Sequence, residues 1–211
     1  MKIGVVGTGY VGLVTGTCFS YVGNNVICLD IDKNKIKQLK NGKVPIYEDK
    51  LDSMINECLD QKTITFTTDI KSTIHNSDIL FLAVSTPMRD DGSSKLDYIL
   101  QAAKDIGKNI NKYKIVVVKS TVPVGTTLLI KKQIENEIQK RKLDISFDIV
   151  NNPEFLKEGK AVNDFMFPDR IIVGIENDSD KNILKNLYKP FSVNHEKIIF
   201  MDILSSELTK Y

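Results

Sequence analysis

The feature that most constrains the fold of this chain is a glycine pattern near its amino terminus, Gly7-x-Gly9-x-x-Gly12. An apolar run at 3–6 precedes the pattern and is typical of a buried parallel strand, and apolar residues at helical spacing follow it. In a strand–turn–helix unit of this kind, Gly7 permits the tight turn and Gly9 lets the backbone approach a pyrophosphate. Gly12 lets the helix pack closely on the sheet, with its first N–H groups facing the phosphates. The pattern therefore predicts a dinucleotide-binding unit.

A second predicted strand, 25–29, ends in Asp30, about 20 residues beyond the glycines, where a carboxylate accepts hydrogen bonds from the adenosine ribose. The same carboxylate repels a 2′-phosphate, so we expect the cofactor to be NAD rather than NADP. The alternative is an ordinary glycine loop with Asp30 as a helix cap. Lys35 lies within reach of the same ribose or its phosphate, although a plain exposed lysine is an equal alternative.

Length and composition fit an ordinary globular protein. The 211 residues suit one large domain, or one domain with the start of another, and a net charge of +2 is too small to indicate nucleic-acid binding. The apolar runs are too short to span a membrane, and no signal peptide is recognisable. Cys18, Cys28 and Cys58 lack metal-ligand spacing, and we expect the first two to be small core residues. Three free thiols and no metal site favour a cytoplasmic protein.

Strand-like and helix-like segments alternate along the chain, which predicts an α/β fold: a doubly wound, Rossmann-like parallel sheet with helices on both faces. Further strands are expected at 64–66, 77–84, 114–118, 147–150, 171–174 and 197–201. Helical segments are expected at about 11–22, 51–59, 98–109, 126–142 and 180–188, with another beginning near 31–36.

Polar residues follow three of these strands at the points where they end. They are Ser85 and Thr86, then Thr121, then Glu154. In open α/β sheets, ligands bind beyond the carboxyl ends of the strands. We therefore expect a common crevice lined by Asp30, Thr86, Thr121 and Glu154. For the pair at 85–86, a simple hydroxyl-stabilised turn is the alternative.

Four segments together resemble a known family. They are Gly-Thr-Gly-Tyr-Val-Gly-Leu-Val-Thr-Gly at 7–16, Lys-Ser-Thr-Val-Pro-Val-Gly-Thr at 119–126, Asn-Pro-Glu-Phe-Leu-Lys-Glu-Gly at 152–159, and Phe-Pro-Asp-Arg-Ile at 167–171. The whole chain resembles the UDP-glucose/GDP-mannose dehydrogenase family, and its opening is most similar to the UDP-glucose branch. The resemblance implies NAD-dependent oxidation of UDP-glucose to UDP-glucuronate, by two hydride transfers through a cysteine-bound intermediate. GDP-mannose or UDP-N-acetylmannosamine as substrate, or an NAD-binding module without turnover, are the alternatives.

The resemblance also implies roles for single residues. Catalysis would involve Thr121, Glu154 and Lys210, and substrate contacts would come from Glu154, Phe155, Leu156 and Lys210. Cofactor contacts would come from the glycine turn with Tyr10 and Val11, from Asp30 and Lys35, and from Ser85, Thr86, Thr121 and Glu158.

Elementary chemistry is compatible with these roles but does not require them. Taking a hydride from an alcohol requires a base for the hydroxyl proton and a cation for the developing oxyanion. From the residues alone, however, Glu154 serves equally as a helix-start carboxylate, and Lys210 as a surface lysine. For Arg170, an ion pair with Asp169 or Asp164 is the preferred interpretation.

The chain departs from the family pattern in two ways. Where the family has Tyr-Glu-Pro-Gly-Leu, this chain has Tyr-Glu-Asp-Lys-Leu at 47–51, which puts the local turn in doubt. The family's nucleophilic cysteine and most uridine contacts belong to a later domain, which no part of this sequence matches. We expect 1–202 to form the NAD-binding domain, and 203–211 to begin the family's central helix, which carries a homodimer interface. That short helix, with a serine cap, is expected to fray. The sequence thus predicts the amino-terminal part of a longer enzyme.

Overall fold

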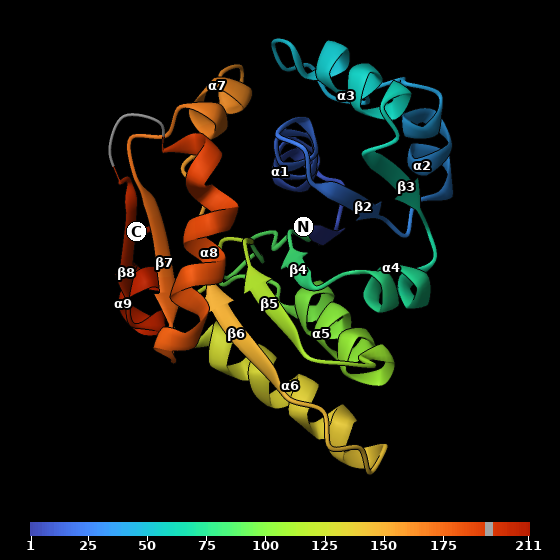
Figure 1. The fold of residues 1–211 in the computed structure, drawn as a ribbon. Coiled ribbons are helices and arrows are strands. Elements are labelled where there is room, and N and C mark those ends of the chain that lie inside the picture. Colours follow the sequence, from blue (N-terminus) through green and yellow to red (C-terminus); the bar gives the residue numbers. More distant parts are fainter. Residues whose placement is uncertain (193–195) are drawn as a thin grey trace.

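The computed structural model describes residues 1–192 and 196–211 and shows one eight-stranded sheet between two layers of helices (Figure 1). The strands are β1 Lys2–Val6, β2 Asn25–Leu29, β3 Ile64–Thr67, β4 Ile79–Leu82, β5 Lys114–Val118, β6 Phe147–Asn151, β7 Ile171–Ile175 and β8 Ile198–Met201. The helices are α1 Tyr10–Tyr21, α2 Lys33–Lys40, α3 Leu51–Asp60, α4 Ile70–Asn76, α5 Asp97–Asn109, α6 Thr126–Lys140, α7 Ala161–Met166, α8 Lys181–Tyr188 and α9 Ile203–Leu208, with short 3-10 turns at Asp178–Asp180 and Lys189–Phe191. Every strand expected from the sequence is present.

Six strands form the predicted doubly wound parallel sheet, in the order β3-β2-β1-β4-β5-β6. The direction of winding reverses between β1 and β4, which is where such sheets bind dinucleotides. All residues of β4 and β5 are buried, because parallel strands are covered by helices on both faces. The predicted Rossmann-like fold is confirmed.

The parallel arrangement does not extend to the whole sheet. β7 runs antiparallel to β6, and β8 is parallel to β7. The connection at 152–170 contains only the short helix α7, which packs against α1 instead of returning along the sheet. β7 therefore starts at the edge where β6 ends and runs back beside it.

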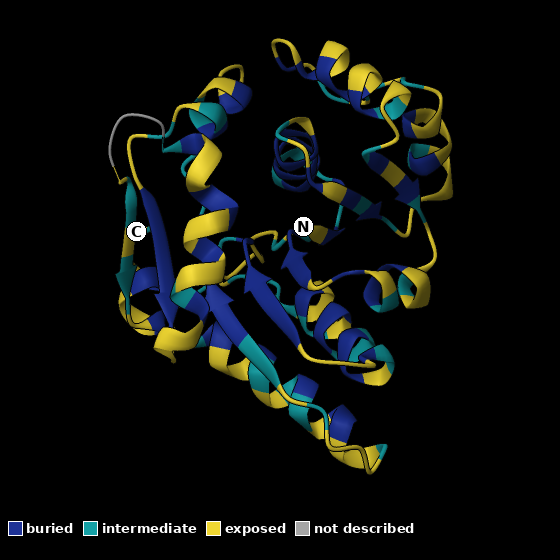
Figure 2. Cartoon of the chain, in the orientation of Figure 1, coloured by how far each residue is buried: buried dark blue, intermediate teal, exposed yellow. Residues whose placement is uncertain are grey.

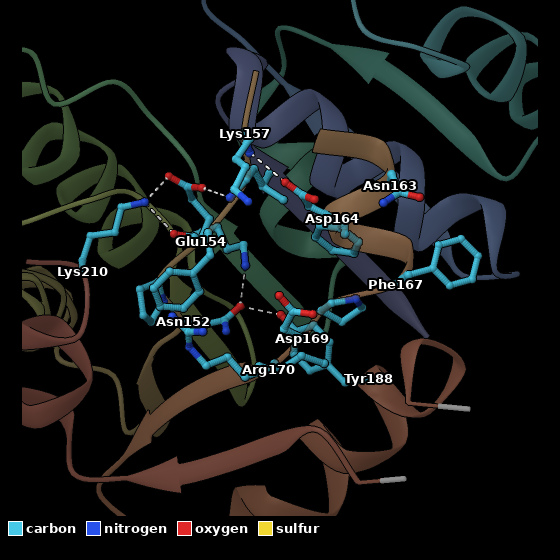
Figure 3. A pocket seen from close by; sticks show the side chains of 17 residues that line it. Asn152, Glu154, Lys157, Asn163, Asp164, Phe167, Asp169, Arg170, Tyr188 and Lys210 are labelled. Atoms are coloured by element: carbon cyan, nitrogen blue, oxygen red, sulfur yellow. Dashed lines mark hydrogen bonds and ion pairs between the residues drawn. The ribbon is translucent and has the colours of Figure 1, made fainter. Parts of the chain in front are cut away.

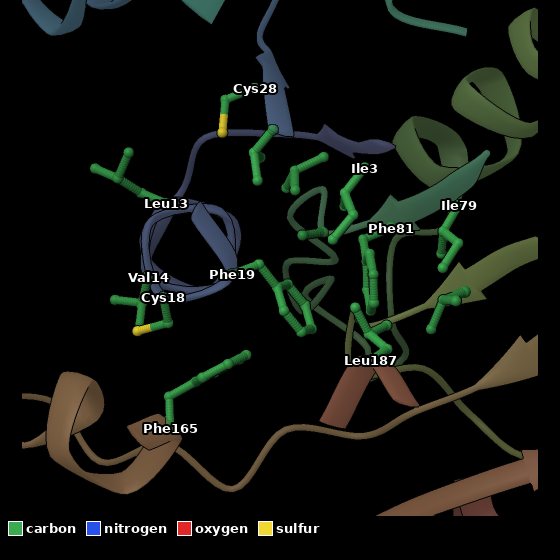
Figure 4. Close-up of a cluster of buried hydrophobic side chains, with 14 of the residues drawn as sticks. Ile3, Leu13, Val14, Cys18, Phe19, Cys28, Ile79, Phe81, Phe165 and Leu187 are labelled. Atoms are coloured by element: carbon green, nitrogen blue, oxygen red, sulfur yellow. The ribbon is translucent and has the colours of Figure 1, made fainter. Parts of the chain in front are cut away.

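Each face of the sheet has its own hydrophobic core. One core lies under α1, α2, α3, α7 and α8, and the other under α4, α5, α6 and α9. Phe19 is central to the first core: its ring lies 5.1 Å from that of Phe81 and 5.3 Å from that of Phe165 (Figure 4). Cys18 and Cys28 are buried in the same cluster, which confirms them as small core residues. The strands are buried throughout the centre of the sheet, whereas the helices are exposed on their outer faces (Figure 2).

Two short helices were not expected from the sequence. α4 is capped at its start by Asp69, whose carboxylate accepts a hydrogen bond from the N–H of Ser72, and is followed by Ser77. Because Ser77 is bonded back to the carbonyl of Thr73, β4 begins two residues later than predicted. The second, α7, has only six residues, which is too few for a periodic pattern to identify.

The longest helix in the described ranges, α6, has 15 residues, and no described helix combines the length and apolar character needed to cross a membrane.

Candidate cofactor and active site at the carboxyl edge of the sheet

The glycine turn between β1 and α1 opens onto a cavity of about 280 Å³. The cavity lies at the point where the strand order reverses, and the ends of β1, β2 and β4 form its floor. Its wall includes the predicted cofactor residues Gly7, Gly9, Asp30, Lys35 and Ser85. The first turn of α1 has no side-chain cap, so its N–H groups are available to an anion.

The three glycines of the turn are required for different physical reasons. Gly7 has φ +100°, and a Cβ on it would lie 2.6 Å from the carbonyl oxygen of Ala83. A Cβ on Gly12 would lie 2.0 Å from the carbonyl oxygen of Gly7. Gly9, in contrast, has φ −70°, and a Cβ on it would meet only the Oγ of Ser85, at 3.9 Å. The fold therefore needs Gly7 and Gly12, but it leaves open space in front of Gly9.

Asp30 sits at the end of β2 as an ionised acceptor. Its Oδ2 accepts hydrogen bonds from the N–H and hydroxyl of Thr8, at 2.9 and 2.7 Å, and from Lys35 Nζ at 3.0 Å. Burial raises the pKa of Asp30, but the hydrogen bonds from Thr8, Asp32 and Lys35 outweigh burial and hold the pKa below its usual value. Lys35 is thus an ion-pair partner at the cavity wall rather than a plain exposed lysine.

The ends of β4 and β5 are joined by hydroxyl groups. Thr86 Oγ1 donates to the carbonyl of Thr121 at 2.7 Å, and Ser120 Oγ donates to the carbonyl of Val84 at 2.6 Å. Thr86 and Thr121 therefore lie together, as expected, but they line neither cavity. The single crevice predicted from the sequence is replaced by two cavities on the same edge of the sheet, because the bridged ends of β4 and β5 come between them.

The second cavity, of about 510 Å³, lies beyond the ends of β5 and β6 and beside the start of β7 (Figure 3). Glu154 is at its wall, in the loop that follows β6. Its Oε1 accepts a hydrogen bond from Lys210 Nζ at 2.7 Å, and its Oε2 accepts one from the N–H of Leu156 at 2.6 Å. Glu154 is therefore a loop carboxylate paired with a lysine from the end of the chain, and not a helix-start residue.

Lys210 reaches this cavity because α9 is firmly anchored. Glu207 is only 2% exposed, and its carboxylate accepts hydrogen bonds from the N–H groups of Gly125 and Thr127, at 2.5 and 2.7 Å. The helix is capped by Asp202 and not by the serine expected from the sequence. The expectation that this segment frays overlooked these tertiary contacts, which hold Lys210 against Glu154.

A buried polar network that the sequence analysis missed supports the same cavity. Lys119 is 5% exposed and donates to Asn152 Oδ1 at 2.9 Å, and the Tyr188 hydroxyl donates to the same oxygen at 2.5 Å. The amide of Asn152 donates in turn to the carbonyl of Ile172 at 2.7 Å. Burial lowers the pKa of Lys119 to about 8. The available signal was a lysine placed directly after the continuous apolar run at 115–118.

The aromatic ring of Phe155 holds two cations at the cavity. The guanidinium of Arg170 lies 4.7 Å from the centre of this ring, and Lys210 Nζ lies 5.6 Å from it. The preferred interpretation of Arg170, an ion pair with Asp169 or Asp164, is wrong: no such pair occurs among the described residues. Asp164 instead accepts a hydrogen bond from the N–H of Lys157 at 3.0 Å.

The remaining predicted site residues do not share one location. Leu156 lines the second cavity and packs on the first core. Val11 packs on the same core from the first turn of α1. Glu158 is exposed and lines neither cavity, although its loop is held against Tyr10 at the start of α1. In the described part of the chain, no three potential metal ligands are grouped together.

Comparisons with known proteins agree with this geometry. The family model for "UDP-glucose/GDP-mannose dehydrogenase family, NAD binding domain" matches residues 1–192. The chain is 46% identical over 210 residues to the UDP-glucose 6-dehydrogenase TuaD of Bacillus subtilis, covering 100% of this chain and 44% of that protein. It is 40% identical over 211 residues to a UDP-glucose 6-dehydrogenase of Pseudomonas aeruginosa, covering 100% and 47%. The chain thus spans about half the length of these relatives.

Solved structures show the same fold. A UDP-glucose dehydrogenase from Pyrobaculum islandicum superimposes with a TM-score of 0.92 at 33% identity, covering 100% of this chain and 48% of the other. A ternary complex of a GDP-mannose dehydrogenase from Pseudomonas aeruginosa also has a TM-score of 0.92, at 32% identity, with coverages of 100% and 48%. The UDP-D-ManNAc dehydrogenase of Pyrococcus horikoshii has a TM-score of 0.89 at 26% identity, with coverages of 100% and 49%.

Proposed function

This chain belongs to the UDP-glucose/GDP-mannose dehydrogenase family, and from that premise we propose that it is the amino-terminal, NAD-binding part of a UDP-glucose 6-dehydrogenase. The complete enzyme would oxidise UDP-glucose to UDP-glucuronate in two successive hydride transfers. Bound NAD accepts the hydride in this chemistry. The residues of this chain bind the cofactor and present one wall of the active site.

The observation that carries the proposal is the open space at Gly9. A glycine there is not required by backbone conformation or by packing, yet it leaves room for a ligand to approach the backbone closely. The first N–H groups of α1, which no side chain caps, directly follow Gly9. This combination fits a dinucleotide pyrophosphate, for which the middle glycine of the turn has that purpose.

Asp30 supports NAD in preference to NADP. Its carboxylate is held ionised at the cavity wall, where it can accept hydrogen bonds from ribose hydroxyls. A 2′-phosphate at that point would be repelled by the carboxylate, and Lys35 is already paired with it. The mostly apolar wall of the cavity, which includes Ile31, suits the adenine ring.

The Glu154–Lys210 pair supports the assignment of the second cavity to the sugar nucleotide. A hydroxyl group placed beside the pair meets a base that can take its proton and a cation that can stabilise the resulting oxyanion. Thr121, at the end of β5, would position the reacting groups from the cofactor side. Phe155 and Leu156 would contribute the contacts of their loop to the substrate.

UDP-glucose is favoured over other sugar nucleotides by the curated relatives that match the whole chain. Curated proteins at 38–46% identity over at least 210 residues are UDP-glucose 6-dehydrogenases. Solved enzymes named for GDP-mannose or UDP-D-ManNAc are 32% and 26% identical. GDP-mannose and UDP-N-acetylmannosamine remain compatible with the residues of this chain, because the enzymes named for these sugar nucleotides have the same fold.

We further propose that 1–202 form the cofactor domain and that α9 begins a helix joining it to the rest of the enzyme. Leu204 and Leu208 are exposed on α9, and Leu129 is exposed on α6, so these residues offer apolar surface to another part of the enzyme or to a second subunit. This surface suits a homodimer interface. All three cysteines are buried and line neither cavity, so the thiol of the proposed intermediate must come from elsewhere. Three free thiols also favour a cytoplasmic enzyme.

Calorimetric titration of the purified chain with NAD and with NADP tests the cofactor assignment. We expect NAD to bind at least about tenfold more tightly, a difference of roughly 1.4 kcal/mol, because Asp30 repels the additional phosphate. In an Asp30→Asn variant, the difference in affinity between NAD and NADP should be smaller, because the substitution weakens NAD binding and strengthens NADP binding. Equal affinities of the wild-type chain for the two cofactors would contradict the role given to Asp30.

A further inference from the structure

A buried carboxylate joins the two halves of the site. Glu48, in the loop before α3, is only 5% exposed. Its Oε2 accepts a hydrogen bond from the Tyr10 hydroxyl and another from the N–H of Gly159, at 2.9 Å. The Gly159 N–H also lies 3.1 Å from the Tyr10 hydroxyl oxygen. Three segments that are distant in sequence thus meet at one carboxylate.

The two partners of Glu48 line neither cavity themselves, but each lies in a segment that contributes other residues to one of them. Tyr10 is the first residue of α1 and directly follows Gly9, so its own N–H belongs to the turn that faces the cofactor cavity. Gly159 ends the loop that begins after β6 and carries Glu154 at the second cavity. The Tyr10 hydroxyl also lies 3.5 Å from the carbonyl of Lys157 in that loop. Glu48 is therefore a physical connection between the cofactor turn and the substrate loop.

Glu48 is buried without an ionic partner in the part of the chain that the structure describes. Among the described residues, no cationic side chain forms an ion pair with it, and its Oε1 is buried without a hydrogen-bond partner. A buried carboxylate compensated only by neutral donors destabilises a folded protein. Burial and then the hydrogen bond to Glu48 raise the pKa of Tyr10 to about 12, so the hydroxyl keeps its proton and remains a donor. A buried acidic residue that keeps one oxygen unpartnered, yet joins two functional segments, points to a role in function.

We propose that Glu48 is a positioning residue that couples occupancy of the cofactor turn to the order of the Glu154 loop. This proposal rests on the proposed function. A pyrophosphate bound at the N–H groups of α1 fixes the first turn of the helix and so fixes Tyr10. Tyr10 then holds Glu48, and Glu48 holds Gly159. By thermodynamic reciprocity, a ligand that orders the loop also tightens cofactor binding.

Hydrogen–deuterium exchange of the whole 211-residue chain, with and without saturating NAD, tests the coupling. In the wild-type chain we expect NAD to slow exchange in peptides covering 154–160 by about fivefold or more. Tyr10→Phe and Glu48→Ala should lose this slowing, because each breaks the connection. Glu48→Gln should keep it, since a glutamine oxygen still accepts both hydrogen bonds. Tyr47→Phe is the matched control, because Tyr47 is adjacent in sequence but 91% exposed.

Thermal melting with NAD separates failure of the coupling from failure of the function. If NAD stabilises both the wild-type chain and Tyr10→Phe, and slows exchange of the loop equally in both, the coupling is wrong and the cofactor assignment stands. If NAD neither stabilises the wild-type chain nor slows its loop, the proposed function fails, and the coupling fails with it. If Glu48→Ala does not fold, Tyr10→Phe decides the question, because it removes a single hydroxyl.

Discussion

Three lysines in the described ranges adopt the left-handed backbone conformation that favours glycine: Lys50, Lys62 and Lys142. Lys50 is the most informative, because it lies at the start of α3 with φ +65°. It occupies the position at which the resemblance places the glycine of Tyr-Glu-Pro-Gly-Leu. The turn doubted from the sequence is therefore formed, but by a residue whose Cβ is strained in this conformation.

Lys50→Gly should stabilise the chain. Relief of the strain outweighs the additional freedom that glycine has in the unfolded chain, and we expect a net gain of about 1 kcal/mol, or a melting temperature higher by about 2–4 °C. Lys43→Gly is the matched control: it is an exposed loop lysine outside the positive-φ set and should lose stability. Thermal unfolding of the three proteins measures both effects. If the Lys50→Gly chain were less stable than the wild-type chain, the contacts of the lysine side chain would contribute more to stability than its backbone strain removes.

At the scale of elements, the sequence predicted the strand bounds that a local residue pattern determines. β2 and β5 have the predicted bounds because their apolar runs are continuous and clearly bordered. The antiparallel direction of β7 and the anchoring of α9 were not predictable in this way. The first depends on where α7 packs, and the second on the hydrogen bonds of Glu207 to residues about 80 positions earlier in the chain.

The start of α8 carries a pH-sensitive contact of the same tertiary kind. Asp180, next to α8, is 1% exposed, and the Tyr113 hydroxyl lies 3.1 Å from Asp180 and 2.5 Å from Asp148 on β6. Burial, followed by the charge of Asp148, raises the pKa of Asp180 to about 6. Because the folded-state pKa lies above its ordinary value of 3.8, the stability that protonated Asp180 contributes is lost as pH rises toward 6.

Asp180→Asn should therefore be more stable than the wild-type chain above pH 6, by about 1–2 kcal/mol, and the gain should vanish near pH 4. Asparagine has no charge to bury at any pH, and its oxygen still accepts a hydrogen bond from Tyr113. Urea unfolding at pH 4, 5, 6 and 7 measures the difference. Asp178→Asn, an exposed neighbour paired with Lys181, should show no such pH dependence. A gain independent of pH would contradict the charge-burial explanation.

At the scale of the whole molecule, the sheet brings the predicted residues to one edge, but Asp30 and Glu154 line two separate cavities and Thr86 and Thr121 line neither. The sequence placed Asp30, Thr86, Thr121 and Glu154 correctly at the strand ends, because topology determines which edge the carboxyl ends share. It did not predict the division, which depends on hydroxyl bridges between the ends of β4 and β5. Nor did it identify Lys119 and Asn152, whose burial follows only from the assembled fold.

The central claim is that the turn at Gly9 receives the pyrophosphate of NAD. Thermal melting of the wild-type chain and of Gly9→Val, each with and without NAD, tests it most directly, because a Cβ at Gly9 makes only an ordinary contact, with Ser85, in the protein alone. At a concentration about 100 times its dissociation constant, NAD should stabilise the wild-type chain by about 2.7 kcal/mol, a rise of several degrees in melting temperature. Gly9→Val should fold, with a similar melting temperature in the absence of NAD, and show no rise when NAD is added. Equal rises for the two proteins would contradict the account.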